Sequence, residues 1–321
     1  MIKAKTGYIK TCRYRKTRDY LQNALISLIP LLGFLIFGMI PFMTSAYLSF
    51  TELHSSNLAD AVWVGFKNFE QIFIDEDGMM RYSYLTTLVL MINVPVSIFL
   101  GLYLACLLNK VVKGRKFFRI VVFFPYVCST MVVSFIFKLL YINDYGILNM
   151  GLRKLGFEGV NWLSGTDWNF LISAILMIIW SGLGLVVVLF QSALANVDKN
   201  YYEAAQIDGA SDRVIFWKIT LPAITPILSY LITMKLIWAL QSMTETWTLA
   251  GGANTIIPYW SGTEIQVHNT VVTRLYRMAF TQSYTYGHGI AAAAAWVLTV
   301  VILIVTQINM KLQKRWVCYD F

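Results

Sequence analysis

Long apolar runs alternate with short polar segments along almost the whole chain. Each run approaches or exceeds the roughly 20 residues that an α-helix needs to cross a bilayer. Because backbone polar groups must be satisfied within the segment itself inside lipid, runs of this length favour transmembrane helices. The pattern therefore predicts an all-α membrane protein with six transmembrane helices. They are expected near residues 21–50, 83–108, 119–142, 170–195, 222–247 and 287–311.

The first apolar run follows a basic segment at residues 1–20, as the core of a secretory signal would. However, the run from Leu21 to Phe50 is much longer than the roughly 7–15 apolar residues of a cleaved signal. We therefore expect a retained first transmembrane helix. A bend is expected near Pro30 or Pro41, because proline interrupts helical hydrogen bonding.

Basic residues mark one side of the predicted membrane domain. Of the 26 Lys and Arg residues, 18 lie in segments that share a side with the N-terminus and 6 lie in the alternate segments. Short cytoplasmic loops carry such an excess of basic residues. Both ends are therefore expected in the cytoplasm, together with the loop at 196–221. The expected division is a basic cytoplasmic segment at 1–20, a membrane domain at 21–315 and a cytoplasmic tail at 316–321.

Composition agrees with a membrane protein and narrows its partners. The chain is 57% hydrophobic and 13% charged, with a mean hydropathy of +0.60, whereas soluble domains carry roughly 25% charged residues. The net charge of +9 comes from residues at the edges of apolar runs, so the partner we expect is a lipid bilayer and not a nucleic acid. The four cysteines show no CxxC spacing, and we expect neither a disulfide nor a metal site.

The most distinctive polar segment lies between the fourth and fifth apolar runs. Asn200, with Glu203 three residues later, matches a capping pattern, so a helix is expected to begin at Asn200. Gly209 can take the left-handed conformation that ends a helix, and Ser211 can begin a second short helix. Pro222 then ends that helix or begins the next span. We therefore predict a cytoplasmic helix–turn–helix between transmembrane helices 4 and 5.

The sequence EAAQIDGASDRVIFWKITLP in this segment resembles the EAA loop of permease subunits in bacterial binding-protein-dependent ABC importers. Four other segments resemble recurring parts of the maltose-type sugar permeases: GFKNF at 65–69, FPY at 124–126, DYGILN at 144–149 and NWL at 161–163. The resemblance extends from about residue 22 to residue 315. It implies that a coupling region within residues 196–222 docks in a cleft of an ATP-hydrolysing subunit. The coupling residues that it implies are Glu203, Ala204, Ala205, Asp208, Gly209 and Ala210.

The same resemblance implies an assembly of several subunits in the bacterial cytoplasmic (inner) membrane. Its other members would be a homologous second permease, two ATP-binding subunits and an extracytoplasmic solute-binding protein. The chain contains no GxxxxGK[ST] phosphate-binding loop. We therefore expect a transporter subunit that is not an enzyme and has no cofactor of its own, with ATP and Mg bound by the partner subunits.

Three charged residues fall within the predicted spans, where charge is costly and usually functional. Lys138 lies near a helix end and can extend its amine to the interface. Lys235 lies near the middle of its span and cannot do so easily. With Trp238, Ser242 and Glu245 it forms an i, i+3, i+7, i+10 series, which predicts one face of a helix. This face either lines the substrate pathway or pairs its charges with the sister permease.

The resemblance adds Trp180 and Ser181, because substrate contacts in maltose-type permeases come from this span and from the span before the EAA loop. An aromatic ring between polar groups suits a sugar, and Lys235 favours an acidic oligosaccharide that contains uronate, such as one derived from alginate. We therefore predict an importer of an oligosaccharide that works by alternating access. One alternative is an ion-coupled secondary transporter of a polar solute, for which only Glu245 is a suitable intramembrane acid. The other is a membrane-embedded enzyme, for which the sequence shows no reactive His/Asp/Glu cluster.

Overall fold

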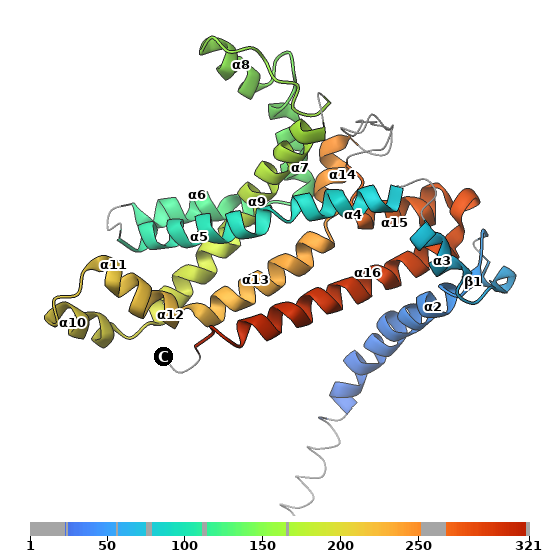
Figure 1. Cartoon of the computed structure of the whole chain (residues 1–321), viewed down its shortest axis with the longest axis horizontal. Helices are drawn as coiled ribbons and strands as arrows, with labels where there is room; N and C mark the ends of the chain where they lie inside the picture. The colour runs from blue at the N-terminus through green and yellow to red at the C-terminus, as the bar shows by residue number, and fades with distance from the viewer. Residues whose placement is uncertain are drawn as a thin grey trace, which may run out of the picture.

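A computed structural model of the chain shows a molecule built almost entirely of helices (Figure 1). It describes residues 23, 25–55, 57–74, 79–110, 114–164, 167–251 and 268–318. The predicted basic segment at 1–20 and residues 319–321 of the predicted tail lie outside the described residues.

The first half of the described chain contains one short antiparallel β-ribbon, in which Thr51 lies opposite Trp63. All other elements of this half are helical. Their bounds, with those of the two strands, are the π-helix η1 (Leu35–Met39), α2 (Ile40–Leu48), β1 (Thr51–Glu52), the 3-10 helix η2 (Leu58–Asp60), β2 (Val62–Trp63), α3 (Lys67–Ile74), α4 (Met79–Leu90), α5 (Asn93–Lys110), α6 (Arg115–Val127), α7 (Thr130–Leu140) and α8 (Ile147–Lys154).

The second half contains the two longest helices, α9 and α16, with shorter helices between them. The elements are α9 (Asp167–Asn196), α10 (Lys199–Ile207), α11 (Asp212–Ile215), the π-helix η3 (Phe216–Thr220), α12 (Leu221–Ala223), α13 (Thr225–Leu240), α14 (Thr244–Ala250), α15 (Val271–Tyr276), the π-helix η4 (Arg277–Thr281) and α16 (Ser283–Gln313).

Among the described residues, four helices are long and apolar enough to cross a membrane: Leu25–Leu48, Met80–Asn109, Trp168–Asn196 and Gly287–Gln313. Two further helix pairs pass the same test but are sharply bent, so the number of candidate spans is six if each pair counts as one. The first four agree with the predicted first, second, fourth and sixth spans. The predicted third and fifth spans were expected as continuous helices, and both are broken.

The third predicted span, 119–142, is divided into α6 and α7, which lie at 100° to each other. Cys128 (φ −71°, ψ 145°) and Ser129 (φ −56°, ψ 134°) have extended backbone between the two helices. Pro125, one turn earlier, has no N–H group to donate to the preceding turn, which weakens the end of α6. This break could not be predicted from the length of the apolar run.

The fifth predicted span, 222–247, is interrupted twice. The first break is at Ile224 (φ −97°, ψ 2°), where the chain bends by 63°. Pro226 cannot donate a hydrogen bond to the carbonyl of Pro222, and its ring crowds that carbonyl, which explains the break. The second break follows Leu240, where α13 ends and the separate helix α14 begins after three residues.

The first apolar helix is largely exposed. Its apolar window is 0% buried, although Phe42 of α2 packs against Trp296 of α16 with the ring centres 4.8 Å apart. Figure 1 shows the N-terminal part of this helix diverging from α16. The irregular turn η1 lies just before Pro41, one of the two positions predicted for a bend, whereas Pro30 lies in regular helix. A π-helical turn takes up the change in hydrogen-bond register that the missing N–H of Pro41 causes.

Helices α5, α9 and α13 share one apolar core. Val94 from α5, Phe190 from α9 and Leu231 from α13 are all buried in it. A methyl group added to Gly101 of α5 would overlap Val186 of α9, so the two helices approach each other closely. This packing fixes α9 relative to α13.

Candidate functional site

The polar segment after α9 folds into two short helices joined by a tight turn, as its sequence predicts. We call residues 198–223 the coupling knob; Figure 1 shows it at one end of the molecule, next to the C-terminus. The predicted N-cap was wrong. Asp198 caps α10, and its carboxylate accepts a hydrogen bond of 3.0 Å from the N–H of Asn200. Aspartate is favoured because its charge also matches the positive end of the helix dipole, and Glu203 consequently lies within α10.

The turn of the coupling knob is built around Gly209. Its φ of +72° is in the left-handed region, where glycine is not strained. The N–H of Ala210 donates to the carbonyl of Ala205 at 2.9 Å, and the N–H of Gly209 donates to that of Gln206 at 3.1 Å. These two bonds form a Schellman motif, which satisfies carbonyl groups at the end of α10. Gly209 therefore ends the helix, as predicted.

Most of the predicted coupling residues lie on the open surface of the knob. Glu203, Ala204, Asp208 and Gly209 are exposed, and Ala205 and Ala210 are half-buried. Sequence reasoning missed Ile207, which is 87% exposed, although an apolar residue directly before an Asp-Gly turn was a usable signal.

Hydrogen bonds hold the knob together and connect α13 to α16. Inside the knob, the hydroxyl groups of Tyr202 and Thr220 lie 3.2 Å apart and share a hydrogen bond. Beyond the bend at residue 224, Ser229 of α13 donates to Gln313 of α16 at 2.6 Å, and Gln313 donates to Thr233 at 3.1 Å. The helices α13 and α16 therefore form one hydrogen-bonded unit. Each of the two helices carries a pair of polar residues four positions apart within an apolar span. The sequence reasoning did not use this signal of a helix–helix contact.

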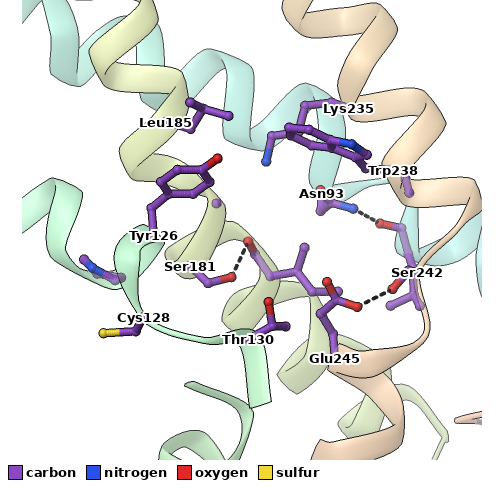
Figure 2. Close-up of a pocket in the computed structure, with 15 residues that line it drawn as sticks. Asn93, Tyr126, Cys128, Thr130, Ser181, Leu185, Lys235, Trp238, Ser242 and Glu245 are labelled. Atoms are coloured by element: carbon purple, nitrogen blue, oxygen red, sulfur yellow. Dashed lines mark hydrogen bonds between the residues drawn. The ribbon is translucent and has the colours of Figure 1, made fainter. Parts of the chain in front are cut away.

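A second candidate site is a cavity of about 280 Å³ between α9, α13 and the two broken spans (Figure 2). This volume is near the lower end of the roughly 300–1,000 Å³ of small-molecule sites. Of the predicted pathway residues, the cavity brings together Ser181, Lys235, Trp238, Ser242 and Glu245.

Two of the three helix breaks, at Cys128 and after Leu240, lie at this cavity. Cys128 and Thr130, from the break between α6 and α7, line one side, and Ser242, from the break after α13, lines another. Inside a membrane, irregular backbone is tolerated where it lines a cavity or is buried in protein. Transporters commonly build binding sites at such interruptions.

One predicted pathway residue lies elsewhere, and several lining residues were not predicted. Trp180 does not line the cavity, and its ring packs against Phe137 with the ring centres 5.3 Å apart. Consecutive helical residues point about 100° apart, so Ser181 can face the cavity while Trp180 faces away. Polar lining residues that the sequence reasoning missed include Asn93, Tyr126 and Thr130.

Lys235 is the buried cation of the cavity. Its side chain is only 6% exposed, yet among the described residues it forms no hydrogen bond and no ion pair. A buried ammonium group without an ion pair is unfavourable, and charged side chains inside a membrane are usually functional. The ring of Trp238 lies beside it in Figure 2 and is 43% exposed.

Glu245 shares the cavity with Lys235 but not its helix, so the predicted continuous face through position 245 was wrong. α13 ends at Leu240, and Glu245 lies on α14. The carboxylate of Glu245 accepts a hydrogen bond of 3.2 Å from Ser242, and the backbone carbonyl of Ser242 accepts one from Thr270. Glu245 is therefore held by the loop after α13 and leaves Lys235 unpaired.

A buried histidine lies near the other end of α9. His268 is fully buried, and its ring packs edge-to-face on Phe170 with the ring centres 6.4 Å apart. Burial and the positive charge of Arg277 lower the pKa of His268 from 6.5 to about 4. Neither His268 nor any other group of His, Cys, Asp or Glu in the described ranges is placed to hold a metal ion.

The fold agrees with that of a solved transporter. The chain superposes on a crystal structure of a bacterial ABC transporter involved in the import of the acidic polysaccharide alginate with a TM-score of 0.76. The two sequences are 25% identical, and the match covers 93% of this chain and 96% of that chain.

Two curated relatives are sugar permeases. The chain is 31% identical to the multiple sugar-binding transport system permease protein MsmF of Streptococcus mutans over 90% of this chain and 94% of that protein. It is 29% identical to the arabinooligosaccharides transport system permease protein AraP of Bacillus subtilis over 88% of this chain and 85% of AraP.

A family match connects these relatives to the coupling knob and the cavity. Residues 97–317, which include the coupling knob and all of the cavity lining except Leu90 and Asn93, match the family described as binding-protein-dependent transport system inner membrane components. The match to this family and the similarity to sugar permeases argue against the two alternatives, a secondary transporter and a membrane enzyme. The chain belongs to this family and is a permease subunit of an ABC sugar importer.

Proposed function

We propose that this permease imports an acidic oligosaccharide, with the cavity around Lys235 receiving a carboxylate of the sugar. The observation that carries the proposal is the buried ammonium group, which forms no hydrogen bond and no ion pair in the described part of the chain. Trp238 and the hydroxyl groups at the cavity wall suit the rest of a sugar, whose C–H face packs on a ring while its hydroxyls need polar partners. The similarity to a transporter for an acidic polysaccharide supports the same substrate class.

The membrane topology that we propose has six spans, with both ends of the chain in the cytoplasm. It treats each bent helix pair as one span, which gives six. The excess of basic residues, 18 against 6, favours the side that contains the coupling knob as the cytoplasmic side. Residues 21–315 then form the membrane domain, and 1–20 and 316–321 are cytoplasmic. The membrane is the bacterial cytoplasmic (inner) membrane.

The coupling knob then docks on an ATP-hydrolysing partner subunit. Exposed Glu203, Ile207 and Asp208 surround a rigid turn, and the chain has no phosphate-binding loop of its own. ATP and Mg are bound by two such partner subunits, and this chain needs no cofactor. A second permease completes the pathway, and a solute-binding protein delivers the sugar from outside.

Transport proceeds by alternating access in this proposal. ATP binding brings the two motor subunits together and moves the coupling knob. The knob acts on α13 through the bend at Ile224, and α16 follows α13 because Gln313 binds both Ser229 and Thr233. The cavity at the far end of α13 is thereby opened to the opposite side.

The test is ATPase stimulation of the complete complex in lipid, with its solute-binding protein, across acidic and neutral oligosaccharides. Uronic-acid trisaccharides and their carboxyl-reduced neutral counterparts are matched in size and linkage. We expect the acidic sugars to stimulate hydrolysis and the neutral ones to have little effect. Equal stimulation by each matched pair would contradict an acidic substrate. The chain purified alone should hydrolyse no ATP.

A further inference from the structure

Gly182 of α9 lies directly opposite the charged end of Lys235. A methyl group added to Gly182 would lie 2.5 Å from Nζ of Lys235, closer than non-bonded atoms approach. Figure 2 shows the lysine side chain reaching from α13 toward α9. The ammonium group therefore occupies the space that any larger residue at position 182 would fill.

A second glycine of α9, Gly184, allows two helices to pack closely, which Gly182 does not. A methyl group on Gly184 would lie 2.8 Å from the carbonyl oxygen of Val122 and 2.9 Å from Cα of Phe123, so Gly184 allows α6 and α9 to pack. At Gly182 the nearby atoms belong only to the flexible side chain of Lys235. Glycine in a helix costs roughly 1 kcal/mol relative to alanine, and close packing of backbones does not account for Gly182.

The missing side chain at Gly182 determines what the lysine can bind. Serine, asparagine or aspartate at this position would place a hydrogen-bonding group against Nζ and satisfy it from within the protein. Glu245, the acid of the same cavity, is bonded to Ser242 and forms no ion pair with Lys235. The ammonium group thus keeps its capacity for a ligand.

We propose that Gly182 is a specificity-determining residue, which keeps Lys235 unpaired so that a carboxylate of the substrate can bind it. The inference rests on the proposed function, because it assigns the residue that makes the same cavity selective for acidic sugars. Gly182 acts through Lys235 and leaves the binding of neutral sugar groups to the other walls.

The test compares Gly182→Asp with Gly182→Asn in the complete complex in nanodiscs. The two variants add nearly the same bulk, and only aspartate adds a counterion for Lys235. Equilibrium binding is measured for a uronic-acid trisaccharide and for its carboxyl-reduced neutral form, without the solute-binding protein. We expect the ratio of acidic to neutral affinity to fall about tenfold further in the aspartate variant than in the asparagine variant. Equal ratios in the two variants would overturn the role of Gly182.

A double-mutant cycle separates this inference from the proposed function and from a folding defect. Gly182→Asn, whose amide oxygen can accept a hydrogen bond from Nζ, should lower the ratio of acidic to neutral affinity in the wild-type background and leave it unchanged beside Lys235→Met. An unchanged ratio in the wild-type background, or an equal drop in both backgrounds, contradicts the inference. If wild-type protein binds the acidic and neutral sugars equally, the proposed substrate fails instead. Gel filtration of the intact complex shows whether each variant assembles.

Discussion

Gln313, at the end of α16, binds Ser229, 84 residues earlier in α13, through two hydrogen bonds. The hydroxyl of Ser229 donates to Oε1 of Gln313 at 2.6 Å, and Nε2 of Gln313 donates to the carbonyl of Ser229 at 3.1 Å. Both residues are buried, and Thr233 and Asn309 extend the same network. Such bonds within a membrane protein contribute roughly 0.6 kcal/mol each, so the network stabilises the contact between the two helices.

Substitution of Gln313 by leucine tests this connection. The variant keeps the size of the side chain but leaves Ser229 and Thr233 without their partner. We expect about 1–2 kcal/mol lower stability and several-fold slower transport at unchanged binding of ATP, because α16 no longer follows α13. Thermal unfolding and uptake by the reconstituted complex measure the two effects.

Gln307 provides the matched control. It lies on the same helix but is exposed, so Gln307→Leu removes the same amide without breaking the network. Similar losses in the Gln307 and Gln313 variants would mean that α16 does not depend on these hydrogen bonds.

The sequence predicts the apolar spans but not every break within them, and the difference has a physical reason. Hydrophobic length indicated all six candidate spans, because crossing a bilayer needs only a sufficient apolar run. The breaks at Cys128 and after Leu240 escaped prediction, since the residues at both breaks are uncharged. The bend at Ile224 had a local signal in Pro226, which was not used.

The candidate sites likewise contain residues that could be predicted from the sequence and residues that could not. Gly209 could be predicted because its left-handed turn depends on local backbone sterics alone. The space that Gly182 leaves for Lys235 depends on how α9 faces α13, which no local pattern specifies. Glu245 reaches the cavity from a separate helix, so the helical spacing predicted its neighbourhood for the wrong reason.

Removal of the charge at Lys235 tests the acidic substrate directly. Lys235→Met keeps the apolar stem and deletes the ammonium group. We expect uptake and binding of an acidic oligosaccharide to fall by about tenfold or more, while those of a neutral oligosaccharide are retained. Uptake of the two sugars by proteoliposomes, each with its loaded binding protein, measures the difference. If both uptakes stay unchanged, Lys235 does not contact the substrate.

Changes in the coupling knob test its contact with the ATP-hydrolysing subunit. Glu203→Lys reverses a surface charge, and Gly209→Asp places a side chain where φ is +72°, which strains the turn. We expect each variant to lower transport at least about tenfold while delivery of the substrate stays intact, since a knob that docks poorly cannot transmit the motion. Binding of the loaded solute-binding protein should be unaffected.

Glu158→Lys is the control for charge reversal, because Glu158 is exposed in the segment after α8 and far along the chain from the knob. It should leave ATPase activity and transport close to wild type. Normal transport in the Glu203 and Gly209 variants would contradict the coupling role of the knob.

The buried His268 predicts a dependence of stability on pH. Its pKa is about 4 in the folded protein against 6.5 ordinarily, so the unfolded chain binds the proton first as the pH falls. The stabilisation is therefore complete above pH 6.5 and is lost as the pH falls from 6.5 to about 4, to a total of roughly 3 kcal/mol. His268→Gln should flatten the Tm of the purified complex over this range, whereas His54→Gln, at an exposed histidine, should not. A Tm profile that keeps its slope in the His268 variant would assign the acid sensitivity to another group.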